Sequence, residues 1–248
     1  SVSGNIAHNH NEITSMGSSD NIIQGSDKQQ ILRVGEALGS FYGLKFDGIV
    51  QSGEDVSSLP TVNGITPKAG DVKYVDTNND HRIDGNDRQV LGSIQPDFTY
   101  GLSSQLQWGA FDAQVVFAGS HGAKLYNALG RRLEQTGDSY NVLTTVLDSW
   151  TADNGGDRLP LASTTRAFSY IDSRYVQSAS YLKLRNLTIG YRLPLPKAFP
   201  VGIRLYATAS NLFTITPYKG YDPEVSSGTD NGAYPASRTF TFGVNVTL

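Results

Sequence analysis

The stretch FTYGLSSQLQWGAFDAQVVFAG, residues 98–119, decides the fold of this chain. Over residues 98–108 the even-numbered positions are mostly apolar, whereas the odd-numbered positions are small or polar. A period of two residues places these two sets of side chains on opposite faces of a β-strand. The same alternation runs over residues 111–119, and only the dipeptide at residues 109–110 separates the two runs. We therefore expect two antiparallel strands joined by a two-residue hairpin turn.

Four further segments show the same alternation and bring the expected number of strands to six. One of them changes phase in its middle, which predicts a β-bulge near Arg185 and Asn186. Helical periodicity is limited to the stretch near Leu143–Trp150, where we expect about two turns of helix. The four segments are residues 1–11, 181–193, 203–210 and 239–248.

The connections between these six strands alternate between long and short. The long connections span about residues 12–97, 120–180 and 211–238, whereas residues 109–110 and 194–202 form the short ones. Unstructured loops of such length are uncommon in compact soluble domains. Short turns at one end and long loops at the other are typical of outer-membrane β-barrels, whose long loops are extracellular.

Aromatic residues support this interpretation, because Trp108, Phe111, Tyr191 and Phe199 lie next to the short turns. Outer-membrane barrels carry an aromatic girdle at that level. Six strands cannot close a membrane barrel, since the smallest ones have about eight. We therefore expect an all-β fold in which residues 1–248 are the C-terminal portion, with six or so strands, of a larger antiparallel transmembrane β-barrel.

Composition excludes several classes of function. Charged residues make up 17% of the 248 residues, against about 25% in typical soluble domains. The formal net charge of -3 provides no excess of cations for a nucleic-acid partner. The absence of cysteine excludes disulfides and thiolate metal sites. Because the first residues lack the basic and apolar regions of a signal peptide, we expect a mature chain or an internal piece of a longer protein.

The segment DTNNDHRIDGND, residues 76–87, has the spacing of a calcium-binding loop. It departs from the usual pattern at two positions, because His81 replaces the glycine of the sharp turn and the last ligand is an aspartate. An Asx-rich turn held by hydrogen bonds from the backbone to side chains explains the same residues equally well. If calcium binds, its role is structural, and we expect no organic cofactor. The expected ligands are Asp76, Asn78, Asp80, the carbonyl of Arg82, Asp84 and Asp87.

The third long connection is rich in amide, aromatic and carboxylate groups, which can stack on sugar rings and bind hydroxyl groups. Its candidate substrate-binding residues are Asn211, Tyr218, Tyr221 and Asp222, with packing between loops as the alternative role. Asp222 and Glu224 alone do not make a glycosidase pair, so we do not expect an enzyme.

Three polar residues fall on the expected inner face of the barrel, namely Lys183, Arg204 and Tyr206. The sequence leaves open whether they line a substrate cavity or contact a plug inside the barrel. Either role requires the strand phases given above.

Several longer stretches resemble the C-terminal quarter of SusC/RagA-type TonB-dependent outer-membrane transporters of the Bacteroidetes. They include GDVKYVDTNNDHRIDGNDRQVLGSIQPDFTYGLS, SYLKLRNLTIGYRLP, RLYATASNLFTITPYKGYDPEV and YPASRTFTFGVNVTL. GSFYGLKFDGIVQS resembles the segment that precedes them in the family. Leu248 departs from the family pattern, in which the last residue is Phe. These stretches are residues 39–52, 70–103, 180–194, 204–225 and 234–248.

The resemblance implies a 22-stranded barrel with a plug, located in the bacterial outer membrane and in contact with its lipid. It also implies two partners, TonB and a SusD-like surface lipoprotein that captures glycans or peptides. The TonB-binding segment, the plug and the remaining strands would lie outside these 248 residues, and nucleic acid is not an expected partner.

A soluble, calcium-braced, carbohydrate-binding β-sandwich is the alternative. The apolar stripe of residues 240–248 argues against it, because a soluble sheet would need a partner sheet over that stripe. We therefore favour part of a nutrient importer.

Overall fold

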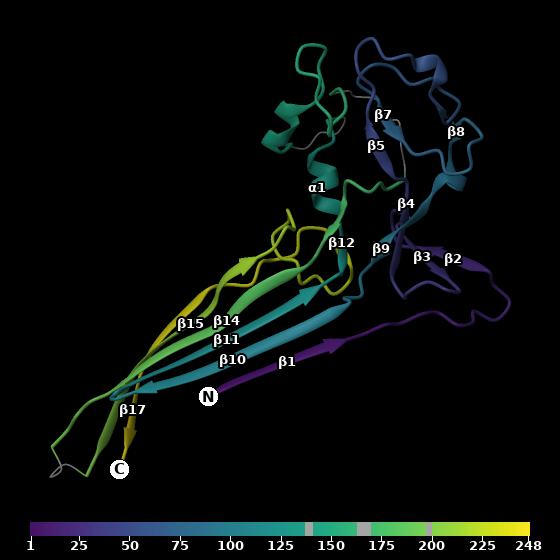
Figure 1. Ribbon diagram of the computed structural model, residues 1–248. Helices are drawn as coiled ribbons and strands as arrows, with labels where there is room; N and C mark the ends of the chain where they lie inside the picture. The colour runs from purple at the N-terminus through teal and green to yellow at the C-terminus, as the bar shows by residue number, and fades with distance from the viewer. Residues whose placement is uncertain (137–140, 163–169, 197–199) are drawn as a thin grey trace.

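The computed structural model describes residues 1–136, 141–162, 170–196 and 200–248. Its longest strands form a six-stranded sheet in the order β1-β10-β11-β14-β15-β17, and every neighbouring pair is antiparallel (Figure 1). All six expected strands are confirmed, and residues 109–110 form the expected hairpin turn between β10 and β11. The strands are β1 (Val2–His8), β10 (Phe98–Trp108), β11 (Phe111–His121), β14 (Tyr181–Arg192), β15 (Gly202–Ile215) and β17 (Thr239–Thr247).

The expected β-bulge lies on β14. The register of β14 against β11 shifts between Leu184 and Asn186, which leaves Arg185 as an extra residue. The register against β15 shifts at the same place, but there β15 has the extra residue, because Asn211 and Leu212 fall between the partners of Leu184 and Asn186. An extra residue reverses the alternation of side chains along the strand. Leu182 before the bulge and Ile189 after it therefore share the same face of the sheet.

This sheet has one apolar and one polar face. Directly opposite residues on neighbouring strands share a face. On the apolar face Leu102 lies opposite Phe117, and Ala207 lies opposite Phe242. Phe242 is 81% exposed, so the apolar face is largely uncovered. The polar face carries opposed pairs such as Gln105 with Gln114, Asn186 with Ser210 and Thr188 with Thr208.

The two ends of the sheet differ as the sequence predicts. The turn between β10 and β11 lies at the end of the sheet near the C-terminus, and the long connections lie at the other end (Figure 1). Trp108 is exposed at the short-turn end, where the rings of Phe111 and Tyr191 contact each other with their centroids 4.6 Å apart and their planes tilted. Phe199 lies outside the described residues. Within the described part of the chain, β1 and β17 each pair on one side only, so the sheet is open.

The long connections contain short elements that the sequence did not reveal. An α-helix, α1, forms where none was expected and is capped by the side chain of Asn127. Near Leu143–Trp150 there is a 3-10 helix in place of the expected helical turns. No helix in the described ranges is long and apolar enough to cross a membrane. The elements are β2 (Asn21–Gln24), β3 (Gln30–Arg33), β4 (Ser40–Gly43), β5 (Phe46–Ile49), η1 (Val56–Ser58), β6 (Thr61–Val62), β7 (Val72–Tyr74), β8 (Arg82–Ile83), η2 (Gly85–Asp87), β9 (Gln89–Ser93), β12 (Lys124–Asn127), α1 (Ala128–Leu133), η3 (Thr144–Asp148), β13 (Val176–Ser178) and β16 (Thr229–Asp230).

The sheet strands β11 and β15 extend further than the sequence predicts, to His121 and Ile215, and so shorten the second and third connections. Together the three long connections form one packed body, which we call the loop unit (the described residues of 12–97, 122–180 and 216–238). Its largest buried cluster joins Phe41 of the first connection to Tyr126 and Ile171 of the second. Hydrogen bonds cross between the same connections, such as the one from the Leu44 backbone N–H to the Ile171 carbonyl at 2.9 Å. The third connection joins through β16, which pairs in parallel with β12. The loop unit therefore has a hydrophobic core of its own, separate from the faces of the long sheet.

Candidate functional site

The predicted calcium loop, residues 76–87, adopts a series of Asx turns that end in η2. Its carboxylates accept hydrogen bonds from backbone N–H groups at 2.7 to 2.9 Å. These contacts are those of an Asx-rich turn, the alternative to calcium binding given above. Across the described ranges, no group of three or more His, Asp or Glu side chains is placed to hold a metal ion. In this set Asp76 accepts from Asn79 and His81, Asp80 from Arg82, Asp84 from Asn86, and Asp87 from Thr77 and Asp84.

One feature of this loop does match a calcium loop. His81 has a φ of 60°, in the left-handed region that the sixth position requires and that glycine usually supplies. Asn78 and the carbonyl of Arg82 keep the positions in the loop that the pattern assigns to ligands. Calcium binding here stays a prediction, and it requires the carboxylates to turn away from their backbone donors.

We expect weak calcium binding, with a Kd of about 0.1 to 1 mM, which is the range of the weakest class of calcium-binding loops. Millimolar calcium should then raise the thermal midpoint of the protein that contains this chain, and Asp80→Asn should abolish the rise by removing one charged ligand. Asp20→Asn, at an exposed acidic residue elsewhere in the first connection, is the matched control. A midpoint that is the same with and without calcium would leave only the Asx-turn role.

The candidate substrate-binding residues of the third connection differ in what they contact. Tyr218 is buried and donates its hydroxyl to Asp230 at 2.7 Å. Asn211 lies within β15 and not in a loop as predicted, and its side chain donates to the carbonyl of Ser237 at 3.2 Å. Tyr221, in contrast, is 66% exposed. Tyr218 and Asn211 therefore have packing roles in this conformation. A substrate role for any of the four candidates, Asp222 included, stays a prediction.

Asp222 belongs to an ionic cluster that fastens the third connection to the long sheet. Its centre is Lys183 of β14, whose side chain is only 2% exposed. The Lys183 Nζ lies 3.3 Å from each carboxylate oxygen of Asp222 and also binds Glu224. Glu224 further accepts from Arg185 and, at 2.7 Å, from the hydroxyl of Tyr181. We call these five residues the Lys183 cluster.

The electrostatics of the Lys183 cluster favour an ionised Glu224. Burial alone would raise the pKa of this carboxyl, but hydrogen bonds from Lys183, Tyr181 and Arg185 outweigh burial and lower the pKa. The sequence alone allows Lys183 to lie either on a cavity wall or against a plug. The structure shows that it binds carboxylates of its own chain, 39 and 41 residues further along.

Arg204 makes a second ionic contact on the polar face of the sheet. Its Nε donates to Asp112 at 2.8 Å, although β14 lies between their strands. Gly190 of β14 makes this crossing possible, because a Cβ at that position would lie 2.4 to 2.6 Å from atoms of both side chains. Any larger residue at position 190 would therefore disrupt the ion pair.

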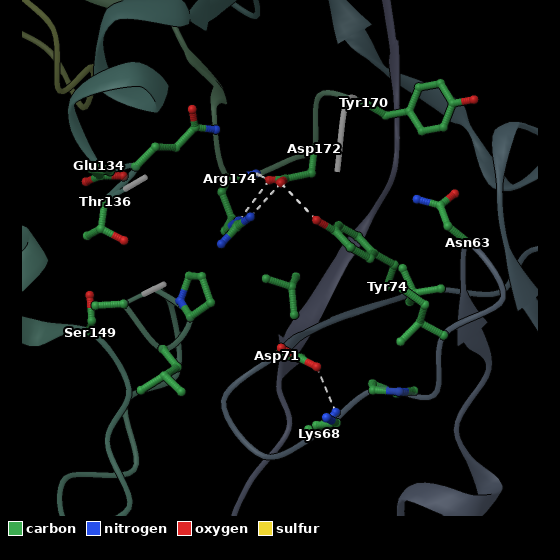
Figure 2. A pocket seen from close by; sticks show the side chains of 18 of the residues that line it. Asn63, Lys68, Asp71, Tyr74, Glu134, Thr136, Ser149, Tyr170, Asp172 and Arg174 are labelled. Carbon is green, nitrogen blue, oxygen red and sulfur yellow. Dashed lines mark hydrogen bonds and ion pairs between the residues drawn. The ribbon is translucent and has the colours of Figure 1, made fainter. Parts of the chain in front are cut away.

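A cavity of about 440 Å³ lies within the loop unit, and no pattern in the sequence indicates it (Figure 2). Its volume falls within the range of small-molecule sites. One wall comes from residues 62–74 of the first connection, and the other comes from described residues between 131 and 175 of the second. None of its described lining residues belongs to the six-stranded sheet.

An ionic network of Tyr74, Asp172 and Arg174 forms the polar side of the cavity (Figure 2). Arg174 binds Asp172 through Nε at 2.9 Å and through its terminal nitrogen at 2.7 Å. Burial acts to lower the pKa of Arg174, but the charge and hydrogen bonds of Asp172 raise it overall. Tyr74 donates its hydroxyl to Asp172 at 3.4 Å, and burial together with the charge of Asp172 raises the pKa of this hydroxyl. The guanidinium therefore stays charged and the tyrosine stays protonated.

The remaining lining of the cavity is apolar at some positions and carries hydroxyl or amide groups at others. Apolar contacts come from both connections, and three tyrosines line the space. The apolar residues include Val62, Pro67, Val72, Pro160 and Leu161, and the residues with hydroxyl or amide groups include Thr66, Gln135 and Ser149.

No protein-family model matches the chain. TonB-dependent receptor P3 of Formosa agariphila is 32% identical to it over 99% of the chain and 26% of the receptor. TonB-dependent receptor SusC of Bacteroides thetaiotaomicron is 31% identical over 99% of the chain and 24% of the receptor. The chain therefore spans about a quarter of the length of these relatives.

Two solved structures are also similar to this chain over nearly its whole length. A structure of the RagAB peptide transporter superimposes with a TM-score of 0.78 and 26% identity, over 98% of this chain and 26% of that chain. The RagAB peptide importer in its open-open state superimposes with a TM-score of 0.75 and 25% identity. The likeness covers both the long sheet and the loop unit, since it includes nearly the whole chain.

Proposed function

We infer that this chain, which is homologous to SusC/RagA-family TonB-dependent receptors over about a quarter of their length, is part of an outer-membrane nutrient importer. In this proposal the long sheet is a section of the barrel wall, C-terminal within the whole protein, and the loop unit is extracellular. The activity is transport and not catalysis. TonB would supply the energy through a part of the protein outside these residues, and a SusD-like lipoprotein would be the partner at the cell surface.

The observation that carries this proposal is the two-faced sheet. Its apolar face is uncovered, and its polar face carries amide, hydroxyl and ionic side chains. A transmembrane barrel needs this arrangement, with apolar residues toward lipid and polar residues toward the lumen. The alternative, a soluble β-sandwich, needs a second sheet over the apolar face, and no such sheet covers it in the described part of the chain.

The substrate class stays open between glycans and peptides in this proposal. One of the similar structures is described as a peptide transporter, but its likeness extends over only 26% of that chain. The importer proposal is tested by uptake of labelled oligosaccharides and oligopeptides into cells with and without the gene. We expect uptake of one class to require both the gene and TonB, and uptake that is independent of TonB would contradict the proposal.

The lipid-facing assignment predicts the effect of a charge on β17. Phe242→Arg should destabilise the barrel by about 2 to 4 kcal/mol if Phe242 lies near the middle of the bilayer. The cause is the transfer of a guanidinium into hydrocarbon. The amount of protein assembled in the outer membrane, measured by blotting of membrane fractions, should fall.

Thr241→Arg is the matched control, because Thr241 lies next to Phe242 in the chain but on the polar face, opposite Thr208. This change should leave the assembled amount nearly unaltered. Equal effects of the two substitutions would show that the two faces do not differ in environment, and the barrel interpretation would fail.

A further inference from the structure

We propose that the cavity in the loop unit is a binding site for an uncharged, hydroxylated ring, namely one sugar unit of a neutral saccharide. The site is distinct from the polar face of the long sheet, because its lining comes from the first and second connections only. The location of this site at the cell surface rests on the proposed function. The ability of the cavity to bind a saccharide does not depend on that function.

The charges around the cavity favour an uncharged ligand. Three cationic side chains line it, Lys68, Arg131 and Arg174, together with three acidic ones, Asp71, Glu134 and Asp172. The buried charges are paired with partners inside the fold, so a charged ligand would have to compete with an existing ion pair. These pairs are Arg174 with Asp172, Glu134 with Arg158, and Arg131 with Asp27.

The polar side of the cavity favours a ligand with hydroxyl groups. The guanidinium of Arg174 has five N–H groups, and its hydrogen bonds to described residues use three of them, two to Asp172 and one to the carbonyl of Arg158. A purely apolar ligand, such as a hydrocarbon side chain, would offer the remaining N–H groups of this buried guanidinium no hydrogen-bond acceptor. A sugar hydroxyl oxygen is such an acceptor.

The rest of the lining fits the two kinds of surface that a sugar ring presents. A sugar ring has apolar C–H faces and a polar rim, and the cavity offers tyrosine and proline side chains beside hydroxyl and amide groups. Tyr74, Tyr170 and Tyr175 line it together with Pro67 and Pro160. Figure 2 shows Tyr74, Asp172 and Arg174 on one side of the open space and Ser149 on another.

The test measures sugar binding to the whole protein that contains this chain, purified in detergent, by calorimetry. The probes are the neutral disaccharides maltose, cellobiose and lactose, with N-acetyltyrosinamide as an uncharged probe of peptide chemistry. At least one disaccharide should bind, and Ile65→Trp, at the cavity wall, should weaken its binding about tenfold or more by filling the space. Ile22→Trp, on β2 and away from the cavity, should leave binding unchanged. Both positions are exposed, 68% for Ile65 and 46% for Ile22, so neither change should disturb the core.

Tyr74→Phe provides a second measurement at the cavity itself. Loss of the hydroxyl that donates to Asp172 should weaken binding of the same disaccharide by about three- to tenfold. The proposal is overturned if no disaccharide binds, if Ile65→Trp and Ile22→Trp have equal effects, or if only N-acetyltyrosinamide binds. Binding is measured without TonB or a membrane, so saccharide binding in a protein that fails to import would contradict only the proposed function.

Discussion

Lys183→Met should lower the free energy of unfolding of the protein that contains this chain by about 1 to 3 kcal/mol, because it removes the buried cation that binds Asp222 and Glu224 and leaves Glu224 with Arg185 alone. Lys183 is almost fully buried and contacts both Asp222 and Glu224. Methionine retains most of the apolar volume of the lysine side chain, so the loss is mainly electrostatic. Denaturant unfolding in detergent is the measurement.

Two further variants separate this electrostatic effect from a packing effect. Lys219→Met, at an exposed lysine of the same connection, should change stability by less than about 0.5 kcal/mol. Adding Asp222→Asn and Glu224→Gln to Lys183→Met should restore part of the loss, since no unpaired carboxylate then remains. If the triple variant is as unstable as the single variant, the ionic explanation is wrong.

The same variant has a predicted pH dependence. The pKa of Glu224 is lowered in the folded protein, so its ionised form stabilises the fold at pH values above the ordinary glutamate pKa of about 4.3. This contribution is lost as the pH falls through the lowered pKa of Glu224. The difference between wild type and Lys183→Met should therefore be largest near neutral pH and should shrink in acid.

The long strands could be predicted because each obeys one strong local rule. Alternation with a period of two specified β10 and β11 at nearly every residue, and the change of phase near Arg185 located the bulge on β14. Such patterns exist because one face of the sheet must be apolar along its whole length. The number of the long strands followed from the same pattern.

The loop unit could not be predicted, because its order depends on contacts between distant residues. Strands such as β6 and β16 have two residues each, too few to show any period. The ion pair of Asp172 and Arg174 is local, but Tyr74, which completes the polar side of the cavity, lies 98 residues before Asp172. A cavity formed by two connections leaves no spacing for sequence analysis to find.

The Lys183 cluster could be predicted from the sequence only in part. The stretches SYLKLRNLTIGYRLP and RLYATASNLFTITPYKGYDPEV each carry the family resemblance, and the structure joins them through Lys183, Asp222 and Glu224. The sequence identified the residues but not the contact, because lysine on an inner face has many possible partners. The bulge at Arg185 contributes as well, since it lets Arg185 reach the same carboxylate as Lys183.

Expressed alone in water without detergent, these 248 residues should aggregate. The apolar face of the six-stranded sheet carries exposed side chains such as Leu106, Phe240 and Phe242. This contiguous area exceeds the few hundred Å² that a soluble monomer usually exposes. Both outer strands also offer unpaired backbone groups, which promote pairing between chains.

In the assembled barrel both edges should be covered by other strands. The free edge of β1 should pair with a strand that precedes it in the whole protein, and the free edge of β17 should pair antiparallel with the first strand of the barrel. Hydrogen exchange of the whole protein in detergent should therefore show slow exchange at the outward N–H groups of both strands. A monodisperse, monomeric fragment with a cooperative melt in water would instead require a partner for the apolar face within these residues, and the soluble β-sandwich would then be the better interpretation.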